Sequence, residues 1–438
     1  MSMKKGVILV SAYVLIVLLP VLLALLTGPA GDGFVINLAK NFGLMGFVIL
    51  ALQAVLASRL KWLSRPFGYD IVIRYHRNLS IFAVLILLAH PFLMIVGYGA
   101  WSLLWGGGLI IWLGKIALFL VTVNVLISVY QTKLHLKFER WRVFHDLLGP
   151  ALLVLAFTHS WFIGGDLQGQ GMRALWIVLL GTAISVFVYH RFIRPWRLSR
   201  RPYEVTEVKT EAENVWTVKM SPGRQKRFDY IPGQFQFITF LRNRGLPEEE
   251  HHWTISSSPT QEGFVASTIK ALGDFTSTIG ETRPGDQAVI HAPFGRFSYL
   301  FHPDEKELVF IAGGVGITPL MSMLRYMRDK KESIPVTLLY GSPDRKSVVF
   351  YDELRDMERG DFPNLKFIPV LQNPEKDWTG ESGYIDKDMI QKHVDTSKEQ
   401  MGFYLVGPPP LLYKSIDNLH ALGIKDKRIH VEVFSFLD

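Results

Sequence analysis

The sequence of 438 residues contains no cysteine. This absence excludes disulfide bonds, thiolate metal sites and thiol nucleophiles. No calcium-binding loop of the D-x-[DN]-x-[DN]-G form and no proline-rich docking segment occurs either, so we expect no obligate cytosolic activator. The formal net charge is +8, but the basic residues cluster beside hydrophobic runs and form no solvated stripe. That pattern indicates membrane topology and argues against nucleic-acid binding.

Charged residues are scarce up to about residue 195, where Leu, Val, Ile, Phe and Ala dominate. Beyond that point the composition is that of a soluble mixed protein. No small-residue cleavage site follows the first apolar run, so we interpret it as a retained helix and not as a signal peptide. Six runs approach the length of about 20 residues that a membrane-spanning helix needs. They cover 6–26, 36–57, 74–97, 108–130, 143–163 and 173–195.

Three of the loops between these runs contain no Lys or Arg: "TGPAGDGF", "YGAWSLLWGGG" and "GGDLQGQG". The loops on the other side carry the basic residues. Because positive charge is retained in the cytoplasm, we expect both termini and the whole soluble half to be cytoplasmic. The sequence therefore predicts a multi-pass protein of the plasma (inner) membrane, embedded in the lipid bilayer.

Two apolar runs carry histidines with the same separation. His76 and His90 lie fourteen residues apart in the third run, and His145 and His159 lie fourteen apart in the fifth. Fourteen residues make about four helical turns, so each pair lies on one helix face about 21 Å apart. Since both helices run outward, His76 is level with His145 and His90 with His159. Two stacked hemes, each held by one imidazole from either helix, require this arrangement.

Intramembrane histidines can also have other roles. A single one often serves only as a helix–helix hydrogen bond, but two matched pairs favour heme iron ligation. A voltage sensor or channel is disfavoured because no run carries Arg at every third position. We interpret His135 and His190, at the inner boundary, as interfacial residues. Candidates to accompany heme propionates are Arg74 and Arg77 on the inner side, and Lys40 and Arg173 on the outer side.

From about residue 200 to 303, short alternating segments separated by turns predict an antiparallel β-barrel. Three stretches in it are candidates for a flavin site: "YIPGQFQFI", "HHWTISSSP" and "IKALGDFTSTIG". Thr276 occupies a plausible helix N-cap, where backbone N–H groups can receive a pyrophosphate. Each stretch alone is also ordinary strand-and-turn sequence. The candidate residues are Gly233, Gln234, Phe235, His251, Trp253, Thr254, Gly273, Phe275 and Thr276.

From residue 306 strands alternate with helices. "ELVFIAGGVGITPLMSMLRYMRD" reads as a strand, a glycine-rich turn and an amphipathic helix, with Gly313, Gly314, Gly316 and Thr318 in the turn. Glycines at such a turn let the backbone approach a phosphate at the helix N-terminus. This segment therefore predicts a dinucleotide site.

Two further stretches belong to the same predicted site. The strand "PVTLLYGS" ends in "PDRKS", where an adenosine ribose would lie. Ser342, Arg345 and Lys346 suggest a 2′-phosphate and hence NADPH, although NAD enzymes favour an acidic residue there and Asp344 lies in the same turn. The strand in "GFYLVGPPPLL" places Gly407 and Pro408 at its carboxyl end, close to where a nicotinamide should rest.

This order of parts resembles the NADPH oxidase and ferric reductase superfamily, in its bacterial NADPH oxidase-like form, from about residue 40 to the C-terminus. The resemblance implies a six-helix transmembrane heme bundle followed by a ferredoxin-NADP reductase-like module. The expected domains are a di-heme domain at 1–200, an antiparallel β-barrel FAD domain at 201–305 and an α/β doubly wound NADPH domain at 306–438.

The resemblance also implies roles for single residues. The family's His-Pro-x-Thr flavin motif is similar to His251-His252-Trp253-Thr254, with His in place of Pro, and its threonine hydrogen-bonds the flavin. The family's Cys-Gly-Pro near the nicotinamide is similar to "VGP" at 406–408, without the sulfur. The family's terminal aromatic, which stacks on the flavin, corresponds to Phe434 or Phe436, with Phe436 favoured. Thr254 and Phe436 are the expected catalytic residues.

The function that the resemblance implies is transmembrane electron transfer. Cytosolic NADPH would reduce FAD, and electrons would pass through two b-type hemes, each with two histidine ligands, to an external acceptor. Molecular oxygen, giving superoxide, is the favoured acceptor. A ferric or other metal reductase that uses a ferric chelate is the alternative. A rival of another class is a membrane heme carrier or sensor joined to an unrelated flavin reductase.

Overall fold

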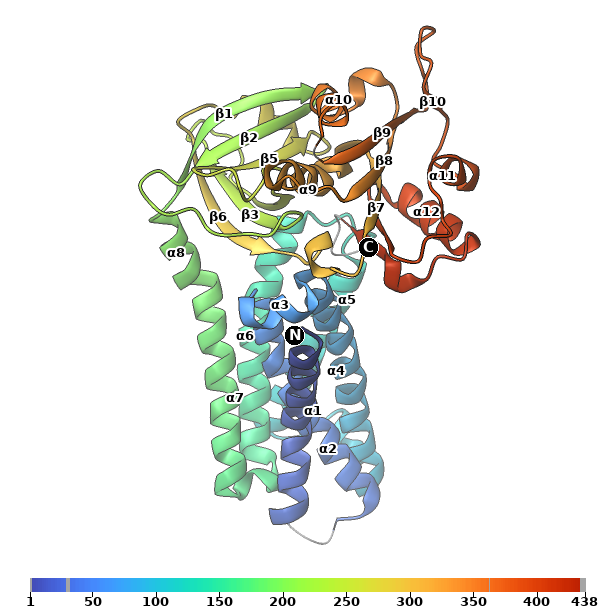
Figure 1. Cartoon of the computed structure of the whole chain (residues 1–438). Helices are drawn as coiled ribbons and strands as arrows, with labels where there is room; N and C mark the ends of the chain where they lie inside the picture. Colours follow the sequence, from blue (N-terminus) through green and yellow to red (C-terminus); the bar gives the residue numbers. More distant parts are fainter. Residues whose placement is uncertain (1, 29–31, 362, 434–438) are drawn as a thin grey trace. The chain divides into compact units, whose positions relative to one another are not determined.

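The computed structural model describes residues 2–28, 32–361 and 363–433. The chain divides into two compact units, Met1–Trp196 and Arg197–Asp438. Each unit has a hydrophobic core of its own. Figure 1 shows long helices in the first unit and the strands of two sheets in the second.

The first unit is a bundle of long helices. Within the described residues, six of its helices are long and apolar enough to cross a membrane, which confirms the predicted spans. Helices α4 and α6 begin at Tyr69 and Phe138, earlier than the predicted apolar runs. The first turns of both helices are polar, so hydropathy alone does not include them in a run. The long helices are α1 (Ser2–Thr27), α2 (Phe34–Ala57), α4 (Tyr69–Tyr98), α5 (Leu109–Tyr130), α6 (Phe138–Ile163) and α7 (Gln170–Val188). Shorter elements are α3 (Lys61–Phe67), η1 (Trp101–Leu104), η2 (Gly165–Gln168), the π-helical turn η3 (Tyr189–Ile193) and α8 (Arg194–Ser199).

The bundle is apolar both inside and outside. Trp176 of α7 is fully buried and stacks on Phe47 of α2, with ring centroids 4.9 Å apart. In contrast, Leu25, Phe119 and Phe162 expose most of their side chains on the outer surface. A helix that is hydrophobic on all sides suits a bilayer, since lipid satisfies the outer face and neighbouring helices satisfy the inner face. The chain is therefore a multi-pass membrane protein.

The second unit begins with an antiparallel sheet. In the part of the chain that the structure describes, its strand order is β4-β3-β6-β1-β2-β5. The amide of Ser256, just after β4, donates to the carbonyl of Ala266 in β5 (2.8 Å), so the two edges of the sheet are joined and the sheet curls into a barrel. The strands are β1 (Tyr203–Ala212), β2 (Val215–Ser221), β3 (Phe235–Leu241), β4 (Glu250–Thr254), β5 (Val265–Lys270) and β6 (Gln287–Phe294). The 3₁₀ turns η4 (Thr276–Glu281) and η5 (Tyr299–Phe301) flank β6.

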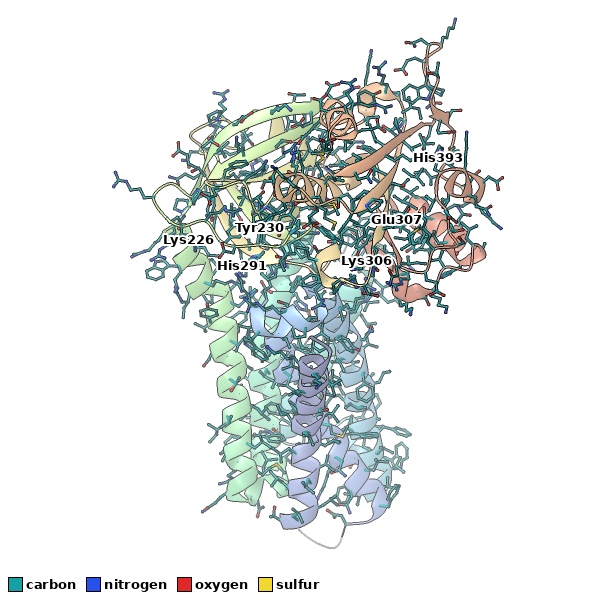
Figure 2. The ribbon with its side chains drawn as sticks, viewed as in Figure 1. Lys226, Tyr230, His291, Lys306, Glu307 and His393 are labelled. Carbon is teal, nitrogen blue, oxygen red and sulfur yellow. The ribbon has the colours of Figure 1, made fainter. Side chains whose placement is uncertain are left out.

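The remainder is a parallel sheet with helices on both faces. Its described strands have the order β10-β9-β8-β7-β11-β12. Buried side chains of α9 and α10 cover one face, and those of α11 and α12 cover the other. Figure 2 labels Lys306 and Glu307 where β7 starts and His393 where α11 ends. The strands are β7 (Glu307–Gly313), β8 (Pro335–Ser342), β9 (Asn364–Leu371), β10 (Glu381–Ser382), β11 (Met401–Val406) and β12 (Ile429–Glu432). The helical elements are η6 (Gly314–Gly316), α9 (Ile317–Lys330), η7 (Arg345–Ser347), α10 (Tyr351–Arg359), α11 (Lys387–His393), α12 (Pro409–Ala421) and η8 (Asp426–Arg428).

The strand order reverses between β7 and β11. In an open parallel sheet this switch point leaves a crevice at the carboxyl ends of the two strands, where dinucleotides bind. The predicted fold class, apolar helices followed by an antiparallel sheet and a doubly wound α/β sheet, is confirmed.

Candidate functional site

The inner pair of histidines faces across the bundle. The rings of His76 on α4 and His145 on α6 have centroids 6.1 Å apart and are inclined at 73°. A metal ion bound by two imidazole nitrogens at about 2 Å each requires ring centroids about 6 Å apart. The spacing of this pair therefore fits an iron held between the two rings.

Hydrogen bonds fix the orientation of the His145 ring. Its Nδ1 lies 3.1 Å from Oδ1 of Asn124 and 3.3 Å from Oγ of Ser128, both on α5. The indole of Trp141 donates to the same Ser128 hydroxyl (3.1 Å) and lies against the imidazole. Because the amide oxygen of Asn124 only accepts, Nδ1 carries the proton and Nε2 keeps the lone pair that a metal needs.

The other half of the inner site contains polar groups without partners. Nδ1 of His76 is buried and makes no hydrogen bond within the described residues, where the backbone carbonyl of Gln53 is the polar group that faces it. Neither amide atom of the buried Gln53 side chain has a partner in the described part of the chain. Both residues line a mostly apolar cavity together with Leu50, Ser80, Val121 and Ala183. Unpartnered buried polar groups beside an apolar cavity are consistent with a bound group that also offers polar atoms.

The outer pair repeats the orienting pattern with backbone acceptors. Nδ1 of His90 lies 2.7 Å from the carbonyl of Ala39 on α2, and Nδ1 of His159 lies 2.8 Å from the carbonyl of Ile110 on α5. Both rings therefore donate through Nδ1 and present Nε2 as a ligand.

Glycines make room for the outer rings. A Cβ at Gly114 would lie 2.5 Å from Nδ1 of His159, and a Cβ at Gly43 would lie 3.1 Å from the ring of His90. Each imidazole thus packs directly on the backbone of a neighbouring helix. The sequence reasoning missed both glycines and the Asn124–Ser128–Trp141 group. For the two glycines, the only indication in the sequence is that each lies inside an apolar run.

His190 is not merely an interfacial residue, so that interpretation is wrong. It lies in the π-helical turn η3 and lines the inner cavity, where its Nδ1 contacts the carbonyl of Ser58 (3.1 Å). The same turn carries Arg191, whose Nε lies 3.6 Å from the carboxylate of Asp146. Because a π-turn widens a helix locally, it can bring side chains toward a cavity that an α-helical path would turn away.

Two of the candidate propionate partners are already engaged. Lys40 pairs with Asp32 and lies 3.8 Å from Asp166, so it is held by carboxylates of two outer loops. Arg173 donates to the carbonyl of Leu167 (2.8 Å).

The structure brings several predicted flavin residues together in the barrel. The rings of His251 and Phe275 stack with centroids 4.4 Å apart, and Trp253 lies 5.5 Å from His251 and 5.9 Å from Phe275. Thr254 pairs with Phe235 across strands β4 and β3. The three aromatic side chains therefore form one surface, and the threonine lies at the end of the same strand.

Other predicted flavin residues brace the barrel itself. Gly233 adopts φ +93°, and a Cβ there would collide with the carbonyl of Phe297, so glycine is required for the fold of this turn. The side-chain amide of Gln234 accepts a hydrogen bond from the backbone N–H of Ile231 through Oε1 and donates one to the carbonyl of Gly295 through Nε2 (2.9 Å each).

Thr276 is not a helix N-cap, so the N-cap expectation is wrong. Its hydroxyl instead accepts from the backbone amides of Leu272 and Gly273 (2.9 Å each), and the 3₁₀ turn that follows has no side-chain cap. In this conformation the amide of Gly273 is already bonded within its own turn.

The nucleotide residues converge at the switch point. A Cβ at Gly316 would lie 2.6 Å from the carbonyl of Val406, and a Cβ at Gly313 would lie 2.9 Å from Pro408. A Cβ at Gly407 would lie 3.1 Å from the backbone of Gly313. The turns after β7 and β11 are thus in backbone contact, directly before α9. The hydroxyl of Tyr340 on β8 donates to the carbonyl of Gly314 (2.8 Å) and so fixes the position of the glycine-rich turn.

The predicted adenosine end carries cations and a free hydroxyl. Oγ of Ser342 is buried without a partner in the described residues. The carboxylate of Asp344 accepts from the amide of Ser347 (2.9 Å) and so caps its own short turn. Arg345 and Lys346 line a cavity of about 620 Å³ together with Tyr351 and with several carboxylates, among them Glu353 and Asp377.

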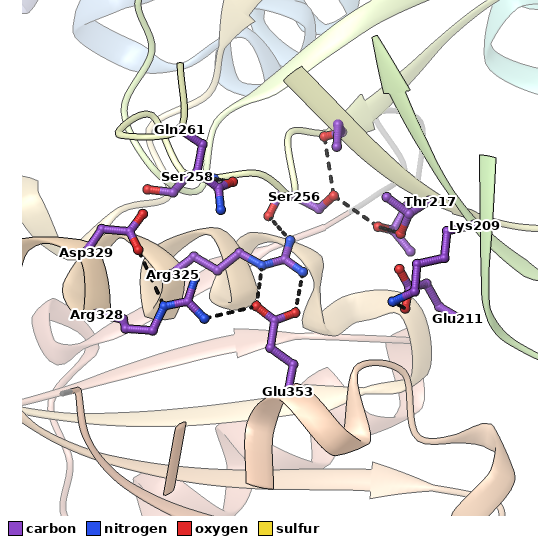
Figure 3. Close-up of polar contacts among 12 residues, drawn as sticks. Lys209, Glu211, Thr217, Ser256, Ser258, Gln261, Arg325, Arg328, Asp329 and Glu353 are labelled. Atoms are coloured by element: carbon purple, nitrogen blue, oxygen red, sulfur yellow. Dashed lines mark hydrogen bonds and ion pairs between the residues drawn. The ribbon is translucent and has the colours of Figure 1, made fainter. Parts of the chain in front are cut away.

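An arginine joins the two halves of the reductase module (Figure 3). Arg325 of α9 donates to the carbonyl of Ser256, in the segment after the flavin-motif threonine (2.7 Å), and forms a two-pronged ion pair with Glu353 of α10 (2.9 and 2.6 Å). Ser322, one turn earlier, donates to the carbonyl of Ser257 (2.7 Å). The helix that starts at the nucleotide turn is therefore fastened to the predicted flavin strand, a link that the sequence did not reveal.

This clamp has a testable pH dependence. Although burial opposes ionisation, the Arg325 guanidinium lowers the pKa of Glu353 below its ordinary value. The charged carboxylate therefore stabilises the fold above the unfolded-state pKa, and the contribution is lost as the pH falls through the lower folded-state pKa. We expect Glu353→Gln to destabilise the protein at pH 7 by about 1 kcal/mol, and the difference to disappear as the pH falls through the lowered pKa of Glu353. The temperature at which flavin is released on heating measures this loss of stability.

The matched control lies on the same helix. Asp356 pairs with Arg359 at 3.4 Å, and both side chains are about three-quarters exposed. Asp356→Asn should leave the melting temperature unchanged. An equal loss in both variants would mean that the Arg325 pair contributes nothing specific.

Comparison with known proteins agrees with this division. Residues 42–156 match the family described as ferric reductase like transmembrane component, and residues 310–416 match the oxidoreductase NAD-binding domain. One component of the Na(+)-translocating NADH-quinone reductase of Neisseria meningitidis is 29% identical over 202 residues, covering 42% of this chain and 48% of the relative. NADH-cytochrome b5 reductase 1 of Candida glabrata is 28% identical over 183 residues, covering 41% of this chain and 64% of the relative. The chain thus spans about half the length of the first of these relatives.

Among solved structures, the FAD/NAD-binding domain of nitric oxide dioxygenase from Vibrio cholerae is similar at a TM-score of 0.48 and 23% identity, covering 53% of this chain and 98% of the other. Within its described residues, this chain carries six helices long and apolar enough to cross a membrane, and its C-terminal part matches an oxidoreductase NAD-binding family. It combines a ferric reductase-like transmembrane component with an oxidoreductase NAD-binding domain, which is the architecture of the NADPH oxidase and ferric reductase superfamily.

Proposed function

We propose that the chain moves electrons from cytoplasmic NADPH, through FAD and two b-type hemes, to an acceptor on the opposite side of the membrane. The observation that carries the proposal is the facing pair His76 and His145, 6.1 Å apart, beside a cavity with unpartnered polar groups. The separate orientation of His90 and His159 through Nδ1 supports a second, outer heme.

Each part of the chain has a defined task in this function. When bound, the flavin converts the two-electron chemistry of a nicotinamide into the one-electron chemistry of heme iron. The glycine turns at 313–316 and 407 admit the dinucleotide, and the Arg325 clamp holds their helix to the flavin strand. His90, His145 and His159 keep Nε2 available as a ligand because their Nδ1 atoms are hydrogen-bonded, and His76 faces His145 across the inner site. The apolar helices around the four histidines exclude water.

The proposed topology has both termini in the cytoplasm. The loops after α1, α4 and α6 lack Lys and Arg, whereas the opposite ends of the helices carry them. This distribution supports a cytoplasmic reductase module by the positive-inside rule. The plasma (inner) membrane is the proposed location.

NADPH is the proposed donor. Asp344 is engaged in capping its own turn, while Arg345 and Lys346 remain beside the cavity, which favours a 2′-phosphate over a bare ribose. We expect Arg345→Ala to raise the KM for NADPH about 10–100-fold, because a charge-assisted phosphate contact is lost, and to leave the KM for NADH unchanged.

Steady-state kinetics with both nucleotides measures this difference. Arg359→Ala, an exposed arginine on α10, is the control and should change neither KM. A parallel rise in both KM values for Arg345→Ala would contradict the assignment of the 2′-phosphate site.

Oxygen, reduced to superoxide, is the proposed acceptor. Within the described outer-loop residues, Asp32 and Asp166 both lie against Lys40, so a protein cation already occupies the position that a ferric ion would need between them. One NADPH supplies two electrons and would therefore produce two superoxide ions. A ferric reductase is the second candidate, favoured by the match of residues 42–156 to the ferric reductase like component.

The acceptor assay separates the two candidates. Purified protein with FAD and NADPH under air should reduce cytochrome c in a reaction that superoxide dismutase abolishes. Turnover that instead depends on an added ferric chelate would favour the metal reductase. A heme carrier with an unrelated reductase predicts a third result, in which NADPH reduces no heme under anaerobic conditions.

A further inference from the structure

Three potential ligands outside the electron path meet at the base of the α/β sheet. They are His302, in the link that follows η5, Glu305, just before β7, and His430, on β12. One ligand atom from each lies within 4.8 Å of the other two. Glu305 directly precedes Lys306 and Glu307, which are labelled in Figure 2.

The carboxylate of Glu305 is held in place on all sides. Its side chain is only 1% exposed, the hydroxyl of Tyr404 donates to Oε2 (2.6 Å), and Nε2 of His430 lies 2.7 Å from Oε1. Any side chain at position 402 would collide with it, so the carboxylate lies directly on the backbone of β11. A buried carboxylate this well fixed has little freedom to rotate toward solvent.

His302 completes the group and has a different environment. Its ring centroid lies 3.9 Å from that of His430, yet the ring nitrogens of His302 make no hydrogen bond within the described residues. The residue is half-buried, so the group can be reached from solvent on this side. The cluster therefore contains an imidazole that faces a fixed carboxylate and a second imidazole and has no partner of its own.

One nearby cation must be weighed. Arg428 pairs with the exposed Asp304 at 2.8 Å and lies 3.7 Å from Glu305. The two carboxylates outnumber the single guanidinium, so the local charge before any ligand binds is negative. A network that only ties β12 to the interdomain link, with His302 packed on the ring of His430, is the simpler interpretation. It leaves one ligand atom from each of three residues of suitable chemistry within 4.8 Å of the others.

We propose that His302, Glu305 and His430 form a binding site for one divalent transition-metal cation of the Zn²⁺ class. Two imidazole nitrogens and one carboxylate oxygen are a donor set that Zn²⁺ favours, with a fourth position left for water. On binding, the metal takes the place of the proton between His430 Nε2 and Glu305 Oε1. The hydroxyl of Tyr404 stays on the other carboxylate oxygen as an orienting group.

The site lies apart from the predicted heme, flavin and nucleotide positions and does not depend on the proposed function. A bound cation would join the segment between the two halves of the reductase module to β12, the last strand of the described chain. Its expected consequence is a higher melting temperature of the full chain in the presence of the metal.

Equilibrium dialysis of the purified full chain against Zn²⁺, with metal and protein quantified together, tests the proposal. We expect one tightly bound Zn²⁺ per chain and at least a tenfold loss of affinity in His302→Ala. This variant should lower the metal-free melting temperature only slightly, since the ring makes no hydrogen bond and loses only its packing against His430. His420→Ala is the control, because His420 pairs with Asp426 alone (2.7 Å) and should leave Zn²⁺ binding unchanged.

A second readout reports the ligands directly. Zinc-edge X-ray absorption of the loaded protein should show only nitrogen and oxygen neighbours, with imidazole scattering that diminishes in His302→Ala. The proposal is overturned if wild type and His302→Ala bind Zn²⁺ equally, if His420→Ala loses the metal to the same extent, or if the bound zinc shows no imidazole.

Discussion

His145→Ala is expected to lower the heme content from two per chain to one and to abolish the reduction of any external acceptor by NADPH. The substitution removes one of the two axial nitrogens at the inner site, and the other histidine that lines the cavity, His190, is already in contact with the carbonyl of Ser58. Because the inner site would be the only entry for electrons to the outer one, activity should fall at least 100-fold. Heme quantification and anaerobic reduction spectra measure both effects.

A histidine from the same region provides the control. His135 is exposed, follows α5 and does not line the cavity. It adopts φ +51°, a conformation that asparagine tolerates, so His135→Asn avoids backbone strain. This variant should keep both hemes and full activity. A His145→Ala protein that retained two hemes per chain would contradict the assignment of the inner ligand.

Gly114→Ala is expected to affect the outer site alone. The new Cβ would lie 2.5 Å from Nδ1 of His159, so the ring must move and lose its hydrogen bond to Ile110. The loss of such an orienting bond costs about 10–100-fold in metal affinity. We expect the outer heme to be lost or weakly held, while the inner heme remains and is still reduced by NADPH. Redox titration of the visible spectrum separates the two.

Gly181→Ala makes the same chemical change on α7, where an added Cβ meets nothing within 4 Å. It should leave both hemes unaltered. If Gly114→Ala behaved like this control, close packing of the outer imidazole would not be what positions it.

The histidine pairs could be predicted because they depend on properties local to each helix. Hydropathy defines a span, and a separation of fourteen residues defines a face, without knowledge of the neighbours. Asn124 and Gly114, both on α5, could not be found in this way. Their roles arise only when α5 packs against α6, and each is an ordinary residue in its own run.

The nucleotide turn was predictable for a different reason. Glycines 313 and 316 follow an apolar strand and precede an amphipathic helix, so the motif carries its own structural context. Gly233 and Thr276 lacked such context. Glycine is needed at position 233 because of a contact with the distant Phe297. The hydroxyl of Thr276 accepts hydrogen bonds from the backbone of Leu272 and Gly273, and these take the place of a helix cap.

The Arg325 clamp also joins residues far apart in sequence and could not be inferred from either end. The predicted terminal aromatic residues, Phe434 and Phe436, lie outside the described residues. Their stacking on a flavin stays a prediction.

The most direct test of the account is the number of hemes bound per chain. The proposed path needs two hemes, held by four histidines in two oriented pairs, one of which is spaced for a metal between its rings. Protein purified after growth with ample iron and heme precursor should give two b-type hemes per polypeptide by the pyridine hemochromogen assay, against protein measured by amino-acid analysis. A colourless protein, or one that holds a single heme when fully loaded, would contradict the proposed path.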